Sequence, residues 1–492
     1  MQALRSTLGF ASKATARKPR VVVLGSGWGG NKVARYLDKS KFDVRVVSPA
    51  NHFLFTPLLP STAVGTLEFR AVQEPVRTIK GLGKYHQAKA QKLDIEKRTV
   101  ECRDIFSGDT FDINYDFLVI SAGCKTNTFA VPGVTQEQQS TVFFLKHLYH
   151  ARRIRDRILE CFERAASPVA SEEERRDLLH FVVVGGGATS CEFATELSEF
   201  LEKDVRKWYP DLADLVSCSI VEAGDHLLAG FDENCWRYYT KHLREHNVDV
   251  RTGCAITSVD PADDGRVSSA TMANGTTMKF GCMVGSGVEI RFRAPHAIDA
   301  MMSPWPRRLD GVEAHEGPRN ISQDNLADCL TSTQVWSAGL APIKFVEGSS
   351  LEKGKGGRIV VDEYLRAADR VFALGDCAAS REDPLPPTAV AAEQQGAYLA
   401  KCFNTTYYKA GADGPMPAKP DPVRPSAMPF DFLEPLDGLW EASSEFRYVE
   451  RGKMASMGMY GAAVWKSRGR RRVDGVGCRE LDIYTGGVAS RT

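Results

Sequence analysis

The stretch that decides the fold is Val21–Gly30, VVVLGSGWGG. Its four leading apolar residues predict a short buried strand, and Gly25, Gly27 and Gly30 follow at the G-x-G-x-x-G spacing. The first glycine permits a tight turn, the second lets a pyrophosphate approach the backbone, and the third lets a helix pack closely on the strand. A helical stretch to about residue 39 and an apolar run over Val44–Val47 then predict a doubly wound α/β sheet.

The same pattern occurs a second time. The apolar run Phe181–Val184 leads into Gly185 and Gly187, with Ser190 at the third position of the spacing. A helix-rich stretch and another apolar strand follow, and that strand ends in Glu222. This internal repeat predicts two Rossmann-like dinucleotide-binding domains, so one chain can hold two dinucleotides.

Two further strand ends carry candidate binding residues. A buried strand is expected from residue 115 onward, and it ends in a small-residue turn at Gly123. Another strand, Val371–Leu374, ends in Gly375 and Asp376. Asp376 either contacts the ribityl chain of a flavin or caps a helix. The two nucleotide-binding turns favour the cofactor contact.

The acid that ends the second repeat points to the choice of nucleotide. A carboxylate at the position of Glu222 accepts hydrogen bonds from an adenosine ribose and repels a 2′-phosphate, which favours NADH over NADPH. Glu222 follows the glycines by more residues than is usual, because the helix-rich segment Phe193–Leu215 intervenes. The alternative is a surface glutamate at a strand end.

Composition excludes several classes of protein. The chain has 492 residues, 43% of them hydrophobic, and a formal charge of +1, which fits a globular protein of two or three domains and gives no reason to expect nucleic-acid binding. Its twelve cysteines include no CxxC pair, which argues against zinc ribbons, iron–sulfur clusters and disulfide-stapled folds, and we expect no metal site. No apolar run is long enough to span a bilayer as a helix.

The first twenty residues resemble a targeting segment. They contain five basic side chains and several hydroxyl residues, and the first acid is Asp38. A basic, acid-free start is typical of a mitochondrial or plastid transit peptide. The alternative is a disordered basic tail.

Taken together, these motifs resemble the mitochondrial type II NADH dehydrogenases, the alternative, non-proton-pumping members of the two-dinucleotide-binding-domain flavoproteins. The resemblance covers roughly residues 20–275 and 333–404. Besides the two glycine turns, its segments are NHFLFTPLLPSTAVG (51–65), NTFAVPGV (127–134), FLKHLYHARRIR (144–155), RDLLHFVVVGGGATSCEFATEL (176–197) and residues 386–404.

The resemblance implies a rotenone-insensitive type of NADH:quinone oxidoreductase, in which hydride passes from NADH to FAD and electrons pass to a membrane quinone. It places the protein in mitochondria, peripherally on the inner membrane, and leaves a homodimer open. The implied FAD contacts are Gly25, Gly27, Gly30, Ser48 (in place of the usual acid), Thr56, Pro57, Leu58, Gly123, Gly375 and Asp376. The implied NADH contacts are Gly185, Gly187, Ser190 and Glu222. Glu192 matches a family residue near the nicotinamide and flavin, and the implied quinone contacts are Ala391, Gln394 and Gln395.

The resemblance also implies the domain organisation. We expect a transit peptide at 1–19, an FAD-binding domain at 20–147 and 336–405, and an NADH-binding domain at 148–335 with an insertion near 280–330. The divergent region 406–492 is expected to form a small C-terminal domain that serves membrane association and dimerisation.

Departures from the family pattern keep alternatives open. Val390 replaces the first glutamine of the quinone motif, Ser190 replaces a glycine, and a basic run stands at 466–472 where amphipathic anchoring helices are expected. That run either touches anionic lipid or is a solvated tail. One alternative function is therefore a non-catalytic or weakly active flavoprotein subunit. Another is a sulfide:quinone reductase, for which Cys124 and Cys377 are the candidate reactive thiols.

Overall fold

The structure is a computed structural model of the chain. It describes residues 17–128, 131–134, 141–261, 265–285, 339–381, 384–423, 442–448, 453–456, 461–465 and 481–485. The expected transit peptide up to residue 16, most of the expected insertion near 280–330 and the basic run 466–472 lie outside the described residues.

The chain divides into two compact units, each built from separated segments. The first unit comprises residues 1–53, 74–123 and 342–448, and the second comprises 54–73, 124–341 and 449–492. The domain boundaries expected from the sequence stay a prediction.

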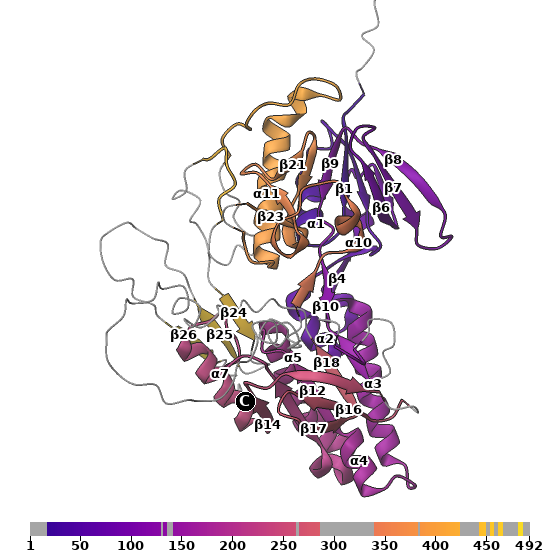
Figure 1. The fold of residues 1–492 in the computed structure, drawn as a ribbon, viewed down its shortest axis with the longest axis vertical. Coiled ribbons are helices and arrows are strands. Elements are labelled where there is room, and N and C mark those ends of the chain that lie inside the picture. Colours follow the sequence, from indigo (N-terminus) through magenta and orange to yellow (C-terminus); the bar gives the residue numbers. More distant parts are fainter. Residues whose placement is uncertain are drawn as a thin grey trace, which may run out of the picture. The chain divides into compact units, whose positions relative to one another are not determined.

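The first unit is built on a six-stranded sheet in the order β21-β22-β9-β1-β2-β5 (Figure 1). All neighbouring strands are parallel except β21, which pairs antiparallel with β22. The strands are β1 (Arg20–Leu24), β2 (Asp43–Val47), β5 (Lys84–His86), β9 (Phe117–Ile120), β21 (Arg366–Ala368) and β22 (Val371–Ala373). The buried strands expected over 21–24, 44–47, 115–123 and 371–374 are thereby confirmed.

Two helices of this unit carry candidate site residues, α1 (Trp28–Tyr36) and α11 (Ala389–Thr405). A separate antiparallel sheet consists of β6 (Ala88–Asp94), β7 (Thr99–Asp104) and β8 (Thr110–Asn114). The smaller elements are β20 (Ile359–Val361), β23 (Ala378–Ser380), α10 (Lys344–Gly348) and the short helical turns η3 (Val76–Thr78), η6 (Lys355–Gly357), η7 (Gly375–Cys377) and η8 (Tyr407–Ala410). Val21, Val22 and Val23 of β1 are fully buried, which contributes roughly 1.5–3 kcal/mol for each side chain.

The second unit has a five-stranded parallel sheet in the order β11-β18-β12-β13-β14. These strands are β11 (Val142–Phe144), β12 (His180–Val184), β13 (Ser217–Val221), β14 (Val248–Arg251) and β18 (Cys282–Gly285). The repeated strand, glycine turn, helix and strand are confirmed in β12, α5 (Ala188–Phe200) and β13.

The other elements of the second unit surround this sheet or form small sheets of their own. The helices are α2 (Leu59–Val64), α3 (Leu148–Ala166), α4 (Glu172–Leu178), α6 (Arg206–Trp208) and α7 (Glu233–Glu245), with shorter turns η1 (Thr56–Leu58), η2 (Phe69–Val72), η4 (Leu201–Val205) and η5 (Pro210–Leu215). The small antiparallel sheets are β15 (Ile256–Asp260) with β16 (Ser268–Met272) and β17 (Thr277–Phe280), β10 (Lys125–Asn127) with β19 (Gly339–Ala341), and β24 (Lys453–Ser456) with β25 (Gly461–Trp465) and β26 (Leu481–Thr485). Among the described residues, no helix is both long and apolar enough to cross a bilayer.

Candidate functional site

The first glycine turn has the geometry that its spacing predicts. Gly25 has a φ of +107° and its N–H donates to the carbonyl of Val47 at 2.8 Å. A Cβ at Gly25 would lie 2.1 Å from the carbonyl oxygen of Ser121, and one at Gly30 would lie 2.2 Å from that of Gly25. Both positions therefore require glycine, because any side chain would collide with the backbone.

Gly27 differs from these two glycines because the space above it is open. A Cβ there would meet nothing within 4 Å, and Gly27 begins α1 without any side-chain cap. The first N–H groups of a helix bind anions well, since they lack intrahelical acceptors and lie at the positive end of the helix dipole. The turn and the start of α1 thus fit the pyrophosphate of a dinucleotide.

The end of β2 carries a hydroxyl where an acid is usual. Ser48 is buried, and its Oγ lies 3.0 Å from the Oγ of Ser26. The Ser26 hydroxyl also lies within hydrogen-bonding distance of the carbonyls of Ala50 and His52, at 3.2 and 3.0 Å. The two serines therefore hold the loop after β2 against the glycine turn without placing a charge there.

The turn after β22 is tied to α11. The N–H of Gly375 donates to Oε1 of Gln395 at 2.7 Å, and Gly375 has a φ of +72°. Asp376 follows in the same turn and is partly buried, whereas Gln394 and Ala391 are buried on α11. Gln395, expected at the quinone, thus supports the turn that presents Asp376. At Gly123, with φ +67°, a Cβ would again meet nothing within 4 Å.

A buried ion pair joins α1 to α11, and no sequence pattern predicts it. Lys32 Nζ contacts Glu393 Oε1, with the two side chains only 7% and 3% exposed. Among the described residues the Glu393 carboxylate accepts no hydrogen bond of good geometry. Beside the pair, a Cβ on Gly396 would lie 2.7 Å from the carbonyl oxygen of Gly29, so the two helices touch at glycines.

The second glycine turn repeats the geometry of the first. Gly185 has a φ of +93° and its N–H donates to the carbonyl of Val221 at 2.9 Å. Gly187 begins α5 with no side-chain cap, so this helix too offers free N–H groups to a phosphate. Ser190, in place of the third glycine, is buried and donates its hydroxyl to the carbonyl of Val184 at 3.1 Å. Where a glycine would let α5 pack closely on β12, Ser190 instead joins the helix to the strand by a hydrogen bond.

Glu222 closes this turn from the end of β13. Its carboxylate accepts from the N–H of Gly186 and, at 2.5 Å, from the N–H of Gly224, and the residue is only 1% exposed. Burial raises the pKa of Glu222 above its ordinary value, while the hydrogen bonds from Gly224 and Gly186 oppose that shift. Each carboxylate oxygen has a second lone pair, so the group keeps the capacity to accept from a ribose.

This geometry can be compared with known proteins. The sequence model of the family described as pyridine nucleotide-disulphide oxidoreductase matches residues 19–301 and 309–396. The chain belongs to this family. A "Probable NADH dehydrogenase" of Dictyostelium discoideum is 36% identical over 391 residues, which are 78% of this chain and 73% of the relative.

The relatives also confirm the subgroup that the sequence resembles. The "Internal alternative NAD(P)H-ubiquinone oxidoreductase A1, mitochondrial" of Arabidopsis thaliana is 34% identical over 477 residues, 93% of this chain and 77% of its own length. Among solved structures, NDH2 from Plasmodium falciparum in complex with NADH has a TM-score of 0.68 at 22% identity and covers 91% of this chain and 90% of its own. The two-domain α/β fold expected from the sequence is thereby confirmed.

Other residues expected in the site lie in the second unit. Glu192 is partly buried on α5, two residues after Ser190. Thr56, Pro57 and Leu58 form η1, and the unit that contains them is the second one, not the first. No sequence pattern indicates this placement, because residues 54–73 interrupt the first unit in the chain.

The two candidate sulfur-carrying thiols have different surroundings. Burial raises the pKa of the Cys377 thiol to about 11, and its Sγ lies 3.3 Å from the carbonyl of Leu374. Such a thiol stays protonated near neutral pH and is a poor nucleophile. Cys124 is partly exposed and lies 3.1 Å from Lys146 Nζ. With Cys377 inert, the pair of reactive cysteines that a sulfide-oxidising member needs is not available from these two residues.

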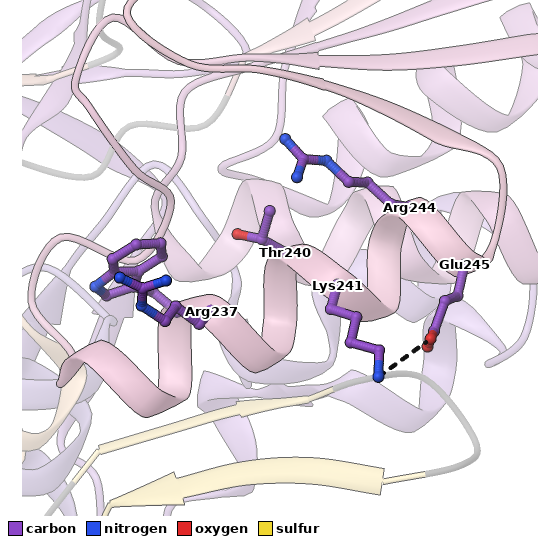
Figure 2. A pocket seen from close by; sticks show the side chains of 6 residues that line it. Arg237, Thr240, Lys241, Arg244 and Glu245 are labelled. Carbon is purple, nitrogen blue, oxygen red and sulfur yellow. Dashed lines mark ion pairs between the residues drawn. The ribbon is translucent and has the colours of Figure 1, made fainter.

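An open hollow on α7 contains none of the residues expected in the site. Figure 2 shows its side chains along one face of the helix, where Lys241 and Glu245 form an ion pair at 3.6 Å with both side chains well exposed. Such pairs are typical of a solvated helix face. Its lining residues are Trp236, Arg237, Thr240, Lys241, Arg244 and Glu245. Within the described part of the chain, no group of three or more His, Cys, Asp or Glu is placed to hold a metal ion.

Replacing Ser190 with alanine should lower the free energy of unfolding by about 1 kcal/mol, because the buried carbonyl of Val184 loses its hydroxyl donor. The KM for NADH should change less than about two-fold, since the hydroxyl faces the strand and not the open side of the turn. Urea denaturation and steady-state kinetics check this. A ten-fold rise in KM with unchanged stability would instead place Ser190 in contact with the dinucleotide.

Proposed function

We propose that the protein is an FAD-dependent NADH:quinone oxidoreductase that does not pump protons. The observation that carries this proposal is the presence of two glycine turns in one chain, each followed by a helix without a side-chain cap. The second turn is closed by the buried carboxylate of Glu222. The names of the relatives, which are NADH dehydrogenases and NAD(P)H-ubiquinone oxidoreductases, support the same assignment.

The residues of the first unit would hold FAD, which supplies the hydride-accepting and electron-passing chemistry when bound. Gly27 and the first turn of α1 would bind the pyrophosphate. Asp376 would accept from the ribityl hydroxyls, and Gln395 keeps its turn in place through Gly375. Thr56, Pro57 and Leu58, which belong to the second unit, are further FAD contacts implied by the family resemblance. The contribution of the protein is orientation and exclusion of water.

The residues of the second unit would bind NADH. Gly187 and the start of α5 would bind its pyrophosphate, and Glu222 would accept from the adenosine ribose. Glu192, on the same helix, would lie near the nicotinamide. On α11, Gln394 and Ala391 would line the quinone pocket. With Val390 in place of the first glutamine of the motif, that pocket loses an amide, which costs about 1 kcal/mol of polar positioning.

A membrane quinone as substrate requires contact with a membrane surface. We propose a peripheral position on the mitochondrial inner membrane, supported by the basic, acid-free first twenty residues and by the mitochondrial relatives. The basic run 466–472 is a proposed contact with anionic lipid. A homodimer through the C-terminal region is part of the same proposal.

The purified protein should show visible flavin absorbance that NADH bleaches under anaerobic conditions and a short-chain quinone restores. A spectrophotometer records both half-reactions separately. Flavin that NADH never bleaches would overturn the proposal and favour the non-catalytic subunit. Bleaching by sulfide that disappears in Cys124→Ser would favour the sulfide:quinone reductase instead.

A further inference from the structure

The segment 54–73 leaves the first unit and packs into the second. The chain enters it from residue 53 and returns at residue 74, both of which belong to the first unit. Its apolar side chains Leu59, Ala63, Val64 and Val72 are buried in the same hydrophobic cluster as residues of α3 and α5. The segment is therefore part of the core of the second unit while both of its ends continue into the first.

A buried carboxylate on α5 fastens this segment. Ser61 donates its hydroxyl to Glu196 Oε1 at 2.7 Å, and Thr66 donates its hydroxyl to Glu196 Oε2 at 2.9 Å. Glu196 is only 7% exposed, so its charge is stabilised mainly by these donors. Hydrogen bonds to an ionised acceptor are roughly twice as strong as neutral ones. The Glu196 carboxylate thus binds α2 at Ser61, within the helix, and at Thr66, two residues beyond its end.

Arg155 of α3 supports the same turn. Gly65 ends α2 with a φ of +89°, and a Cβ there would lie 2.6 Å from Cζ of Arg155. The absence of a side chain at Gly65 lets the guanidinium lie directly against the turn between Ser61 and Thr66. Three contacts from α3 and α5 therefore converge on the six residues Ser61–Thr66.

We propose that Glu196 is a positioning residue for hydride transfer, which fastens segment 54–73 to the helix that begins the NADH site. Glu196 lies one turn after Glu192 on α5, and α5 starts at the second glycine turn. The segment that it holds is covalently continuous with the unit that contains the first glycine turn. The contact therefore fixes, within the NADH-binding unit, the segment whose two ends continue into the unit of the first glycine turn. This inference rests on the proposed function, because hydride transfer depends steeply on the alignment of the two rings.

The test compares Glu196→Ala with Glu199→Ala. Glu199 is a matched control, since it is equally buried on the same helix but pairs with Lys203 at 3.0 Å instead of with segment 54–73. At saturating NADH, rapid mixing should show flavin reduction slowed about ten-fold in Glu196→Ala and nearly unchanged in Glu199→Ala, because only Glu196→Ala loses both hydroxyl contacts with segment 54–73. A ten-fold loss corresponds to about 1.4 kcal/mol in the activation barrier. FAD content and the KM for NADH should stay within about two-fold in both variants.

Two further variants separate positioning from loss of fold. Glu196→Gln should recover most of the rate, because its amide oxygen accepts from one hydroxyl and its amide nitrogen donates to the other. The double variant Ser61→Ala/Thr66→Val leaves α5 intact and should reproduce the slow flavin reduction of Glu196→Ala. Flavin reduction at the wild-type rate in that double variant would overturn the proposal.

Amide hydrogen exchange gives a readout that does not depend on the reaction. The amides of α2 should exchange faster in Glu196→Ala than in Glu199→Ala, since only the first variant releases the segment. Equal exchange in both variants would overturn the fastening role even if NADH reduces the flavin normally. If NADH does not reduce the flavin of the wild-type protein, the proposed function is wrong. The hydrogen-exchange comparison then still tests whether Glu196 fastens the segment.

Discussion

Replacing Lys32 with methionine should lower the free energy of unfolding by about 3–5 kcal/mol, because it leaves the Glu393 carboxylate buried without a counter-ion. The pair is enclosed between α1 and α11, so water does not replace the lost ammonium. Urea denaturation, followed by intrinsic fluorescence, measures the loss. Since α1 begins at the first glycine turn and α11 carries Gln395, the variant should also lose flavin at lower urea concentration than the wild type does.

The control is the double variant Lys32→Met/Glu393→Met, which removes both charges and fills their volume with apolar atoms. It should recover most of the lost stability, because a buried ion pair is often no more stabilising than an apolar pair of similar size. For comparison, Lys409→Met breaks an exposed pair with Asp421 and should leave the free energy of unfolding nearly unchanged. A double variant as unstable as the single one would show that the charges themselves are required.

Replacing Glu222 with glutamine should raise the ratio of kcat/KM for NADPH to that for NADH about 10- to 100-fold, because a neutral amide no longer repels a 2′-phosphate. Steady-state kinetics with the two nucleotides and one quinone measures the ratio. The glutamine keeps the side-chain length but has a single acceptor oxygen for the N–H groups of Gly186 and Gly224. Part of the change should therefore appear as weaker binding of both nucleotides.

The same residue predicts a pH dependence in the wild type. Burial raises the pKa of Glu222 from its ordinary 4.5, so the carboxyl becomes neutral at a higher pH than an exposed glutamate would. Below that pKa the repulsion of the 2′-phosphate is lost, and the relative use of NADPH should rise as the pH falls. The ratio should be flat with pH in Glu222→Gln. A wild-type ratio as flat on acidification as that of Glu222→Gln would mean that Glu222 does not face the 2′ position.

Much of the fold could be predicted because it is encoded locally. β1 and β12 are runs of apolar residues that end in glycines at fixed spacing, and the first glycine of each turn adopts the positive φ of a tight turn. Strands such as β6 escape this kind of prediction, because β6 is mostly polar and its register shifts between Ala90 and Lys92. The place of segment 54–73 in the second unit depends on contacts with distant residues, and no local pattern carries that information.

The candidate site also contains residues that the sequence predicts and residues that only the structure reveals. The glycines and the acid at the end of β13 are recognisable from spacing alone. The contacts of Ser61 with Glu196 and of Lys32 with Glu393 join residues 135 and 361 positions apart, so only the folded chain brings them together. Glu393 stands inside the expected quinone motif, yet attention to the glutamines of that motif gives no hint of its partner on α1. Likewise, the burial of Glu222 and its two backbone donors could not be inferred from its place at a strand end.

The strand order of the first unit has a consequence for biosynthesis. β9 lies between β1 and β22, so a sheet that starts at Arg20 is finished only when Val371–Ala373 has been made. The parallel sheet of the second unit uses only residues 142–285 and is complete on the ribosome well before that point. We therefore expect the parallel sheet of the second unit to form before the sheet of the first unit is complete, although the first unit begins the chain.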